Sequence, residues 1–415
     1  MSGDSAADGR ACTVSGPLAG MRIVDMSSVL MGPFATQMLA DYGADVIKVE
    51  SPDGDLMRLG GAMRNPGMGS LFLQANRNKR SIVLDVKTPA GRDALLRLCR
   101  SADALVHNVR TAAMERARLA YEDIRAVNPE IVYVALVGYG EDGPYAGKPA
   151  YDDLIQGISA VPSLFAAGGG EPRFAPVNMA DRVVGLNAAH AVLAALLCRE
   201  RTGKGQSVEV PMFETMAQFV LGDHFGGLGF EPPIGPPGYN RLMSPDRRPY
   251  RTQDGYLCVL VYTDRQWENF FRAIGRPEDF ADPMYSDHAT RTRNYDHVYA
   301  GLARHLATRT TAEWTAVLTA HDIPCVPAHT IESLLADPHV KAVGLIEDMD
   351  HPSEGRIRMV RPPARWSRTP PGLRLHPPRL GENTREVLAE AGYGEDEIDA
   401  MVASGSARQM VEAER

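Results

Sequence analysis

The stretch that decides the fold is MRIVDMSSVLMGPFATQMLADYGADVIKVE, residues 21–50. Its apolar runs at 22–26 and 45–50 predict two strands. The segment between them, 33–43, predicts a helix, with a proline in its first turn and a glycine at its end. A strand, a helix and a second strand in so short a stretch predict a βαβ unit with parallel strands.

The same alternation continues through the first half of the chain. Further strands are predicted at 81–86, 104–108 and 131–140, with helices at 88–102 and 112–127 between them. Strands separated by amphipathic helices indicate a mostly parallel sheet. The predicted fold class is therefore α/β, with a Rossmann-like large domain.

The second half is organised differently. After about residue 222 the chain becomes rich in Gly and Pro, and then predicts a strand at 254–262 and helices near 264–275, 294–308 and 311–321, which indicates a smaller α/β domain. The expected organisation is a flexible tail at 1–15, a large domain at 16–214, a linker at 215–240, a small domain at 241–335, a return linker at 336–374, and C-terminal helices at 375–415 that pack back on the large domain.

Composition narrows the function classes. The 415 residues carry a formal net charge of −8, which disfavours nucleic acid and anionic membranes as partners. The five cysteines are scattered, which disfavours a disulfide framework. No window approaches the ~18 apolar residues of a membrane span, and the first sixteen residues lack the apolar core of a signal peptide. A cytoplasmic protein is the simplest expectation.

Several common chemical signatures are missing. The first strand-to-helix turn, SSVLMGPFA at 27–35, has one glycine and no G-x-G-x-x-G, so binding of NAD or FAD is not expected. The sequence also lacks a Walker loop, an H-E-x-x-H motif and a G-x-S-x-G elbow. We therefore expect that the protein binds no metal and that it is not a serine hydrolase.

Asp181 is the most suggestive acidic residue that remains. It precedes a long run of small and apolar residues, and a helix starting near Arg182 or Val183 would place it at or near the N-cap. The positive end of the helix dipole would keep the carboxylate ionised and able to attack. Caps far outnumber nucleophiles, so the residues by themselves favour a cap and leave a nucleophile open.

Ordered segments along nearly the whole chain change this balance. They resemble the class III CoA-transferase family, which includes the formyl-CoA transferase and carnitine CoA-transferase types and has the α-methylacyl-CoA racemases as relatives. The resemblance is carried by residues 16–55, 76–98, 102–124, 133–160, 180–214, 334–345 and 378–393. It implies an acyl-CoA:carboxylate CoA-transferase with coenzyme A or acyl-CoA as substrate and no tightly bound cofactor. It also implies an interlocked homodimer.

The resemblance assigns catalytic roles by position. Asp181 matches the family's nucleophile, which passes through aspartyl anhydride and thioester intermediates. Tyr151 and Asp152 match supporting positions of the active site. The alternative is a 2-methylacyl-CoA racemase, which has a His thirty residues before the Asp. Residue 151 is Tyr here, and a phenol with a pKa near ~10 is a poor substitute for His in proton exchange, which favours the transferase.

The resemblance also implies a CoA site. Val29, Leu30 and Met31 lie in the first strand-to-helix turn, Leu84 and Asn108 match positions near the nucleotide, and Arg110 and Arg116 match basic positions facing the phosphates. The region matching the glycine-rich run of formyl-CoA transferase has only one glycine, at Gly238, which argues against oxalate or formate. Arg241, Arg247 and Arg248 in the same region suggest a larger carboxylate or dicarboxylate acceptor.

Overall fold

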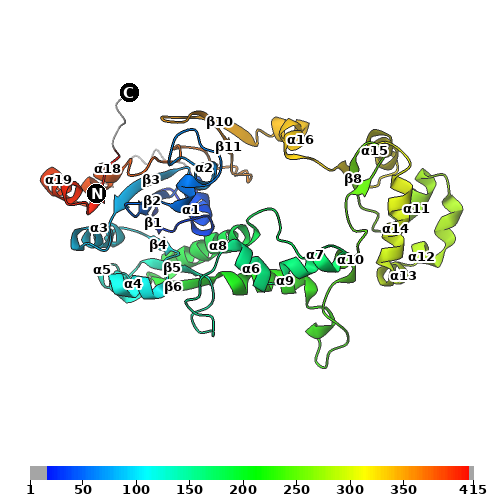
Figure 1. The fold of residues 1–415 in the computed structure, drawn as a ribbon, viewed down its shortest axis with the longest axis horizontal. Helices are drawn as coiled ribbons and strands as arrows, with labels where there is room; N and C mark the ends of the chain where they lie inside the picture. Colours follow the sequence, from blue (N-terminus) through cyan, green and yellow to red (C-terminus); the bar gives the residue numbers. More distant parts are fainter. Residues whose placement is uncertain (1–15, 411–415) are drawn as a thin grey trace, which may run out of the picture. The chain divides into compact units, whose positions relative to one another are not determined.

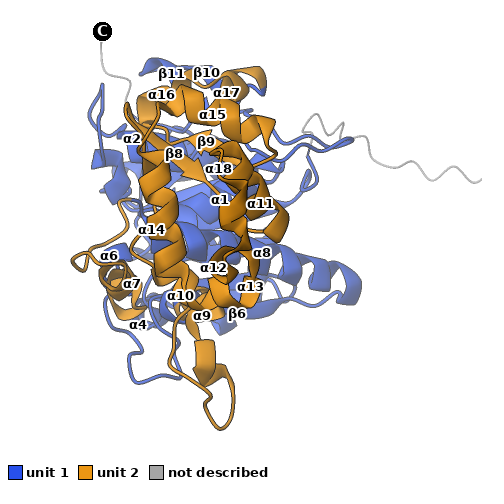
Figure 2. Ribbon diagram, turned by 90° about the vertical axis from the view of Figure 1, so that its right-hand side faces the viewer, with its two compact units in different colours: residues 1–155, 177–216, 343–415 blue, residues 156–176, 217–342 orange. Residues whose placement is uncertain are grey.

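The computed structural model describes residues 16–410, so the predicted tail at 1–15 lies outside the described residues. The described chain forms two compact units (Figure 2). Unit 1 holds the residues up to 155, residues 177–216, and the chain from 343 onward. Unit 2 holds residues 156–176 and 217–342. The segment 156–176, expected within the large domain, thus belongs to unit 2.

A seven-stranded sheet forms the centre of unit 1 (Figure 1). Its strand order is β12-β3-β2-β1-β4-β5-β6, and every pairing is parallel except that of β12 with β3. The strands are β1 (Arg22–Met26), β2 (Asp45–Glu50), β3 (Lys79–Leu84), β4 (Ala104–His107), β5 (Val132–Val137), β6 (Gln206–Pro211) and β12 (Ala407–Arg408). The crossover between β1 and β4 at the centre of the sheet creates a point where ligands commonly bind in α/β folds.

Within the described residues, unit 1 also contains eight helices and one short 3-10 turn that belong with this sheet. They are α1 (Met31–Asp41), α2 (Ser70–Ala75), α3 (Pro89–Arg100), α4 (Thr111–Ala117), α5 (Tyr121–Val127), α8 (Met179–Thr202), α18 (Thr384–Glu390) and α19 (Glu395–Ala403), with the short 3-10 turn η1 (Leu56–Leu59). The helix predicted at 112–127 is two helices, because Arg118 adopts a left-handed conformation with φ of 53° and ends α4.

The long helix α8 is tightly packed against α1. A Cβ atom at Gly185 would lie 2.8 Å from the carbonyl oxygen of Met31, so only glycine permits this approach. Within residues 16–410, α8 is the one helix that is long and apolar enough to cross a membrane by length and composition, whereas no such window was predicted from the sequence. It packs against α1, β5 and β6, and 44% of its apolar window is buried.

The C-terminal part of unit 1 differs from its prediction. The segment expected as a return linker, 336–374, contains an antiparallel hairpin of β10 (Ile346–His351) and β11 (Gly355–Val360). After it, α18 and α19 lie against the edge of the sheet, where Val387, Leu388 and Ile398 join the core beside β3. Short strands with exposed outer faces are hard to recognise in a sequence, which explains the missed hairpin.

Unit 2 has its own small core. A three-stranded antiparallel sheet runs in the order β7-β8-β9, and Trp267, Phe270 and Trp314 are almost fully buried beside it. Its elements are α7 (Val161–Ala167), η2 (Gly226–Gly229), α10 (Asn240–Met243), β7 (Tyr250–Arg251), β8 (Tyr256–Val259), α11 (Asp264–Ala273), η3 (Pro277–Ala281), α12 (Pro283–Ser286), α13 (His288–Arg293), α14 (Tyr295–Leu306), α15 (Thr311–Ala320), β9 (Cys325–Pro327), α16 (Ile331–Ala336) and α17 (Pro338–Ala342). The boundaries of the units are crossed by α6 (Asp152–Ile158) and α9 (Met212–His224).

Candidate active site

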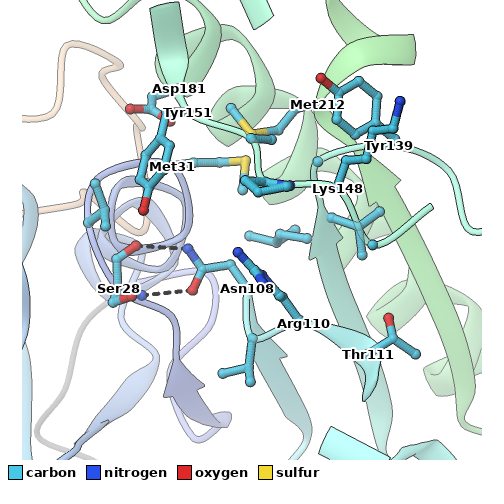
Figure 3. Close-up of a pocket in the computed structure, with 18 of the residues that line it drawn as sticks. Ser28, Met31, Asn108, Arg110, Thr111, Tyr139, Lys148, Tyr151, Asp181 and Met212 are labelled. Carbon is cyan, nitrogen blue, oxygen red and sulfur yellow. Dashed lines mark hydrogen bonds between the residues drawn. The ribbon is translucent and has the colours of Figure 1, made fainter. Parts of the chain in front are cut away.

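Two loops meet at the carboxyl end of the central strands of unit 1. The turn after β1 and the loop after β4 are joined by Asn108, whose Oδ1 accepts from the Ser28 N–H at 3.0 Å and whose Nδ2 donates to the Ser28 carbonyl at 2.8 Å (Figure 3). Asn108 was predicted near the nucleotide. It lines the cavity described below, but its amide is occupied with fixing the shape of the turn.

Val29 in this turn has an unusual backbone conformation. Its φ is 71°, which is rare for a β-branched residue and costs about 1–3 kcal/mol. Its N–H donates to Asp55 Oδ1 at 3.0 Å, and Asp55 Oδ2 accepts from Lys48 Nζ at 2.8 Å. Lys48 also donates to the Ser27 carbonyl at 2.9 Å. A buried ion pair therefore holds the turn in this conformation.

A cavity of about 220 Å³ opens beside the turn, and every residue that lines it belongs to unit 1. Its wall comes from the turn after β1, the loop after β4, the end of β5 with its following loop, and the first turns of α6, α8 and α9. Met31, Asn108, Arg110, Lys148, Tyr151 and Asp181 lie on this wall (Figure 3). Val29 and Asp152 line it as well. The structure thus brings together seven of the ten residues predicted for the site.

Asp181 is the third residue of α8, not its cap. The helix begins at Met179, earlier than expected, and its N-cap residue Asn178 makes no side-chain capping bond. The Asp181 N–H donates to Asp152 Oδ1 at 3.0 Å, so the side chain of Asp152 satisfies a free amide in this first turn. No hydrogen bond to the Asp181 carboxylate is found within residues 16–410. Its oxygens are open to the cavity.

The electrostatics of Asp181 differ from the expectation as well. Burial, together with the negative charge of Asp152, raises the pKa of Asp181 to about 7, and Arg182 opposes this only in part. The expected stabilisation of the carboxylate by the helix N-terminus is outweighed, because desolvation and a like charge both favour the protonated form. A carboxyl group in a cavity with so large a shift is a candidate for chemistry.

Three predicted residues lie outside the cavity wall. Leu30 and Leu84 are each 1% exposed, and Leu84 lies in the hydrophobic core. Arg116 is exposed in the last turn of α4. The side chains of Leu30 and Leu84 are buried, and the contacts of these three residues with CoA stay predictions. The sequence could not distinguish these residues because an apolar side chain at the end of a strand fits a core and a ligand wall equally well.

Three further residues of the cavity wall were not predicted from the sequence. Lys148 lines the cavity, with its Nζ 4.0 Å from the Tyr145 ring centroid, and Met212 and Thr111 lie on the same wall. Lys148 stands only three residues before Tyr151, so proximity in sequence was a usable signal. Lys148 and the exposed Arg110 are the two cationic residues on this wall. Within residues 16–410, no three His, Cys, Asp or Glu side chains are grouped to hold a metal ion.

The fold and the site define an α/β protein with a cavity at the carboxyl edge of its parallel sheet. The wall carries two cationic and three acidic side chains, and the pKa of one of these carboxyl groups, Asp181, is raised. The family model described as CoA-transferase family III matches residues 18–384. The chain belongs to this family and is a class III CoA-transferase.

Several known proteins are similar in sequence to this chain over most of its length. A succinate–glutarate CoA-transferase of Agrobacterium fabrum is 34% identical over 90% of this chain and 95% of its own length. A formyl-CoA:oxalate CoA-transferase of Escherichia coli is 32% identical over 94% of this chain and 99% of its own. The crystal structure of a CAIB/BAIF family protein from Brucella suis superimposes with a TM-score of 0.77 and 30% identity, over 91% of this chain and 100% of that one.

Proposed function

We propose that the protein moves CoA from an acyl-CoA to a carboxylic acid through covalent intermediates on Asp181. The observation that carries this proposal is a cavity-lining carboxylate that has no hydrogen-bond partner on its oxygens within residues 16–410. The oxygens of a capping carboxylate accept hydrogen bonds from backbone N–H groups in the first turn of the helix. Here Asp152 performs that task, and Asp181 is left for a ligand.

The first half of the reaction transfers CoA to the enzyme. An Asp181 oxygen attacks the thioester carbon, the carbon–sulfur bond breaks, and CoA leaves as a thiolate with a mixed anhydride left on Asp181. The thiolate then attacks Cγ of Asp181 and expels the donor acid as a carboxylate. The product is an aspartyl-CoA thioester.

The second half reverses these steps with another acid. The acceptor carboxylate attacks Cγ of Asp181, expels the CoA thiolate and forms a second anhydride. The thiolate attacks the acyl carbon of the acceptor, and Asp181 is released as a carboxylate. No proton is gained or lost over the cycle, and overall the thioester of the donor is replaced by the thioester of the acceptor. Holding CoA in the site between steps keeps the attack effectively intramolecular.

The remaining side chains of the cavity have supporting roles in this proposal. Arg110 and Lys148 supply the cations that CoA phosphates require. Asp152 fixes the first turn of α8 and raises the pKa of Asp181. Tyr151, which is 61% exposed, stands where a racemase of this fold would need a proton-exchanging His. This residue disfavours the racemase alternative.

Trapping the intermediate tests the proposal. Incubation with acyl-CoA and hydroxylamine should convert Asp181 into a hydroxamate, and borohydride should reduce the thioester to an alcohol, both detectable by mass spectrometry of its peptide. The Asp181→Asn variant serves as the control without a label. A label on another residue, or incorporation of solvent deuterium at the α-carbon of the acyl group without CoA transfer, would contradict the proposal.

The raised pKa of Asp181 predicts a pH dependence. Only the carboxylate form attacks, so kcat/KM for the acyl-CoA should rise about tenfold per pH unit below pH 7 and level off above it. Asp152→Asn removes the neighbouring charge while an amide oxygen can still accept from the Asp181 N–H. We expect the rising limb to move to lower pH in this variant. Asp153→Asn is the matched control, and a limb that stays in place for Asp152→Asn would show that the carboxylates are not coupled.

We also propose that the chain forms a homodimer. Two large apolar side chains are exposed on α8: Leu186 is 46% and Leu197 is 52% exposed. They are eleven residues apart, which is about three turns, so both lie on the same face of α8, and an exposed apolar helix face is typical of interfaces between copies. Light scattering should report twice the 45.1 kDa mass of one chain. A stable particle of one chain's mass would exclude the dimer.

A further inference from the structure

The loop after β5, residues 138–151, supplies a large part of the wall of the candidate active site. Its residues on the wall all belong to unit 1, and they are Gly138, Tyr139, Glu141, Gly147, Lys148, Pro149, Ala150 and Tyr151. Lys148 is the one cationic residue in the sequence of this loop. A loop has no continuous ladder of backbone hydrogen bonds, so the position of this charge depends on the contacts that fix the loop.

Two glutamates hold this loop from outside the cavity. The N–H of Gly140 donates to Oε1 of Glu214 at 3.0 Å, and the next N–H, that of Glu141, donates to Oε1 of Glu209 at 3.2 Å. Glu209 lies on β6 and Glu214 in the first turn of α9, and both belong to unit 1. Neither glutamate is among the described residues that line the cavity. They therefore anchor the loop from behind its wall.

The backbone of Gly140 is where Glu214 comes closest to the loop. An ideal Cβ atom at this position would lie 3.0 Å from Oε1 of Glu214 and 3.1 Å from Oδ1 of Asp142, so the approach depends on the absence of a side chain. Gly140 is buried, and a buried N–H group needs a hydrogen-bond partner. Removing the Glu214 carboxylate would therefore take away the partner of a buried N–H group.

A series of contacts connects Gly140 to Lys148. The neighbouring Tyr139 is 8% exposed, and its ring lies edge-on to that of Tyr145 with the centres 5.4 Å apart. Nζ of Lys148 lies 4.0 Å from the centre of the Tyr145 ring, and the Lys148 N–H donates to the Tyr145 carbonyl at 3.0 Å. Tyr139 and Lys148 both lie on the cavity wall (Figure 3). A displaced Gly140 backbone should therefore displace the charge of Lys148 as well.

The second glutamate acts on the other cationic residue of the wall. The side chain of Glu141, whose N–H is held by Glu209, accepts from Oγ1 of Thr111 at 3.0 Å. Thr111 begins α4 and directly follows Arg110 in the chain. The segments that carry Arg110 and Lys148 are thus both tied to the two residues whose N–H groups the glutamates accept.

We propose that Glu214 is a positioning residue for acyl-CoA. By accepting from the N–H of Gly140, it fixes the loop so that Lys148 presents its ammonium group to the phosphates of CoA. Glu209 assists at the next residue of the loop. Glu214 takes no part in the covalent steps. The inference rests on the proposed function to the extent that CoA binds in this cavity.

Calorimetry of CoA binding to the full-length protein tests this role. Glu214→Ala should weaken CoA binding about three- to tenfold, because the loop loses an anchor while water competes for an exposed bond. Glu214→Gln, whose amide oxygen can still accept from the N–H, should bind CoA as the unaltered protein does. Unchanged binding in Glu214→Ala would overturn the proposal, as would equal losses in Glu214→Ala and Glu214→Gln.

Matched variants separate this role from a general loss of structure. Glu130→Ala removes an exposed glutamate that precedes β5, at the end of the strand away from the cavity, and should leave CoA binding unchanged. Glu209→Ala should weaken CoA binding in the same direction as Glu214→Ala. Losses of equal size in Glu130→Ala and Glu214→Ala would overturn the proposal.

A double-substitution cycle tests whether Glu214 acts through Lys148. Lys148→Gln by itself should weaken CoA binding. Adding Glu214→Ala to Lys148→Gln should weaken it by less than about twofold more, because the charge that Glu214 positions is already gone. Losses that multiply, as for two independent sites, would refute the route through Lys148.

Kinetics gives a readout that a merely structural role would not produce. In Glu214→Ala the KM for acyl-CoA should rise about three- to tenfold while kcat stays within about twofold. An acyl thioester of N-acetylcysteamine lacks the phosphates of CoA, so Glu214→Ala should leave kcat/KM for this substrate unchanged. An equal loss of kcat/KM with both thioesters would overturn the proposal.

Trapping on Asp181 keeps this proposal separate from the proposed function. CoA binding that depends on Glu214, without a trapped intermediate, would refute the covalent mechanism and leave the positioning role standing. A trapped intermediate together with CoA binding that is independent of Glu214 would refute the positioning role alone.

Discussion

Asp181→Asn is expected to lower kcat for CoA transfer at least about 10³-fold, because an amide cannot form the anhydride or the thioester. Asparagine has nearly the same size as aspartate, and the Asp181 N–H that donates to Asp152 belongs to the backbone. The first turn of α8 should therefore be retained. Steady-state rates with one acyl-CoA and a panel of acids measure the loss.

The same substitution should stabilise the folded protein near neutral pH. The pKa of Asp181 is raised from 3.8 to about 7, so between these values the folded state binds more protons than the unfolded state. The free energy of unfolding therefore falls as pH rises from about 4 to about 7. Above about pH 7 the folded protein bears the whole cost of a buried, charged Asp181. Asp181→Asn should therefore raise the free energy of unfolding by about 1–3 kcal/mol at pH 8 and leave it almost unchanged at pH 4.

The rate of CoA transfer and the free energy of unfolding of Asp181→Asn together test the role of this residue. A variant that is inactive and more stable at pH 8 identifies Asp181 as a group kept charged for chemistry at the expense of stability. Asp153→Asn, next to Asp152 and exposed, should change neither quantity. Full turnover by Asp181→Asn would refute the covalent role, and lower stability at pH 8 would refute the raised pKa.

Asp55→Asn is expected to destabilise unit 1 by about 3–5 kcal/mol, because it leaves the ammonium of Lys48 buried without its closest partner. The side chains of Lys48 and Asp55 are 0% and 1% exposed, and their charged atoms are 2.8 Å apart. The interaction with Lys48 holds the pKa of Asp55 below its ordinary value, against the effect of burial. Urea unfolding followed by circular dichroism measures the change.

The effect should extend to the substrate. Lys48 also donates to the Ser27 carbonyl, and Asp55 accepts from the N–H of Val29, so the ion pair holds the turn that lines the cavity. We expect a higher KM for acyl-CoA at temperatures where the variant is folded. Asp348→Asn, which breaks an exposed pair with Arg356, should cost less than about 0.5 kcal/mol. A loss of equal size in both variants would show that burial of the pair is unimportant.

The sequence by itself determined the α/β class and the positions of the central strands. The predicted strands at 22–26 and 45–50 coincide with β1 and β2. Parallel strands that are buried on both faces are continuous apolar runs, and this signal is local to each strand. The run of small and apolar residues after Asp181, with the family resemblance, singled out this residue, and the match of the family model over residues 18–384 confirms the family.

Only the tertiary structure decided what the site residues can do. Asn108 is bonded to a turn 80 residues away, Leu84 is in the core, and the pKa of Asp181 depends on Asp152, 29 residues earlier in the chain. Likewise, Arg241 is oriented by Tyr299 from a different helix. Hydrogen bonds, burial and the field of a neighbouring charge depend on distances in space. Hydrophobic periodicity records which face of an element is buried, and it carries no information about these distances.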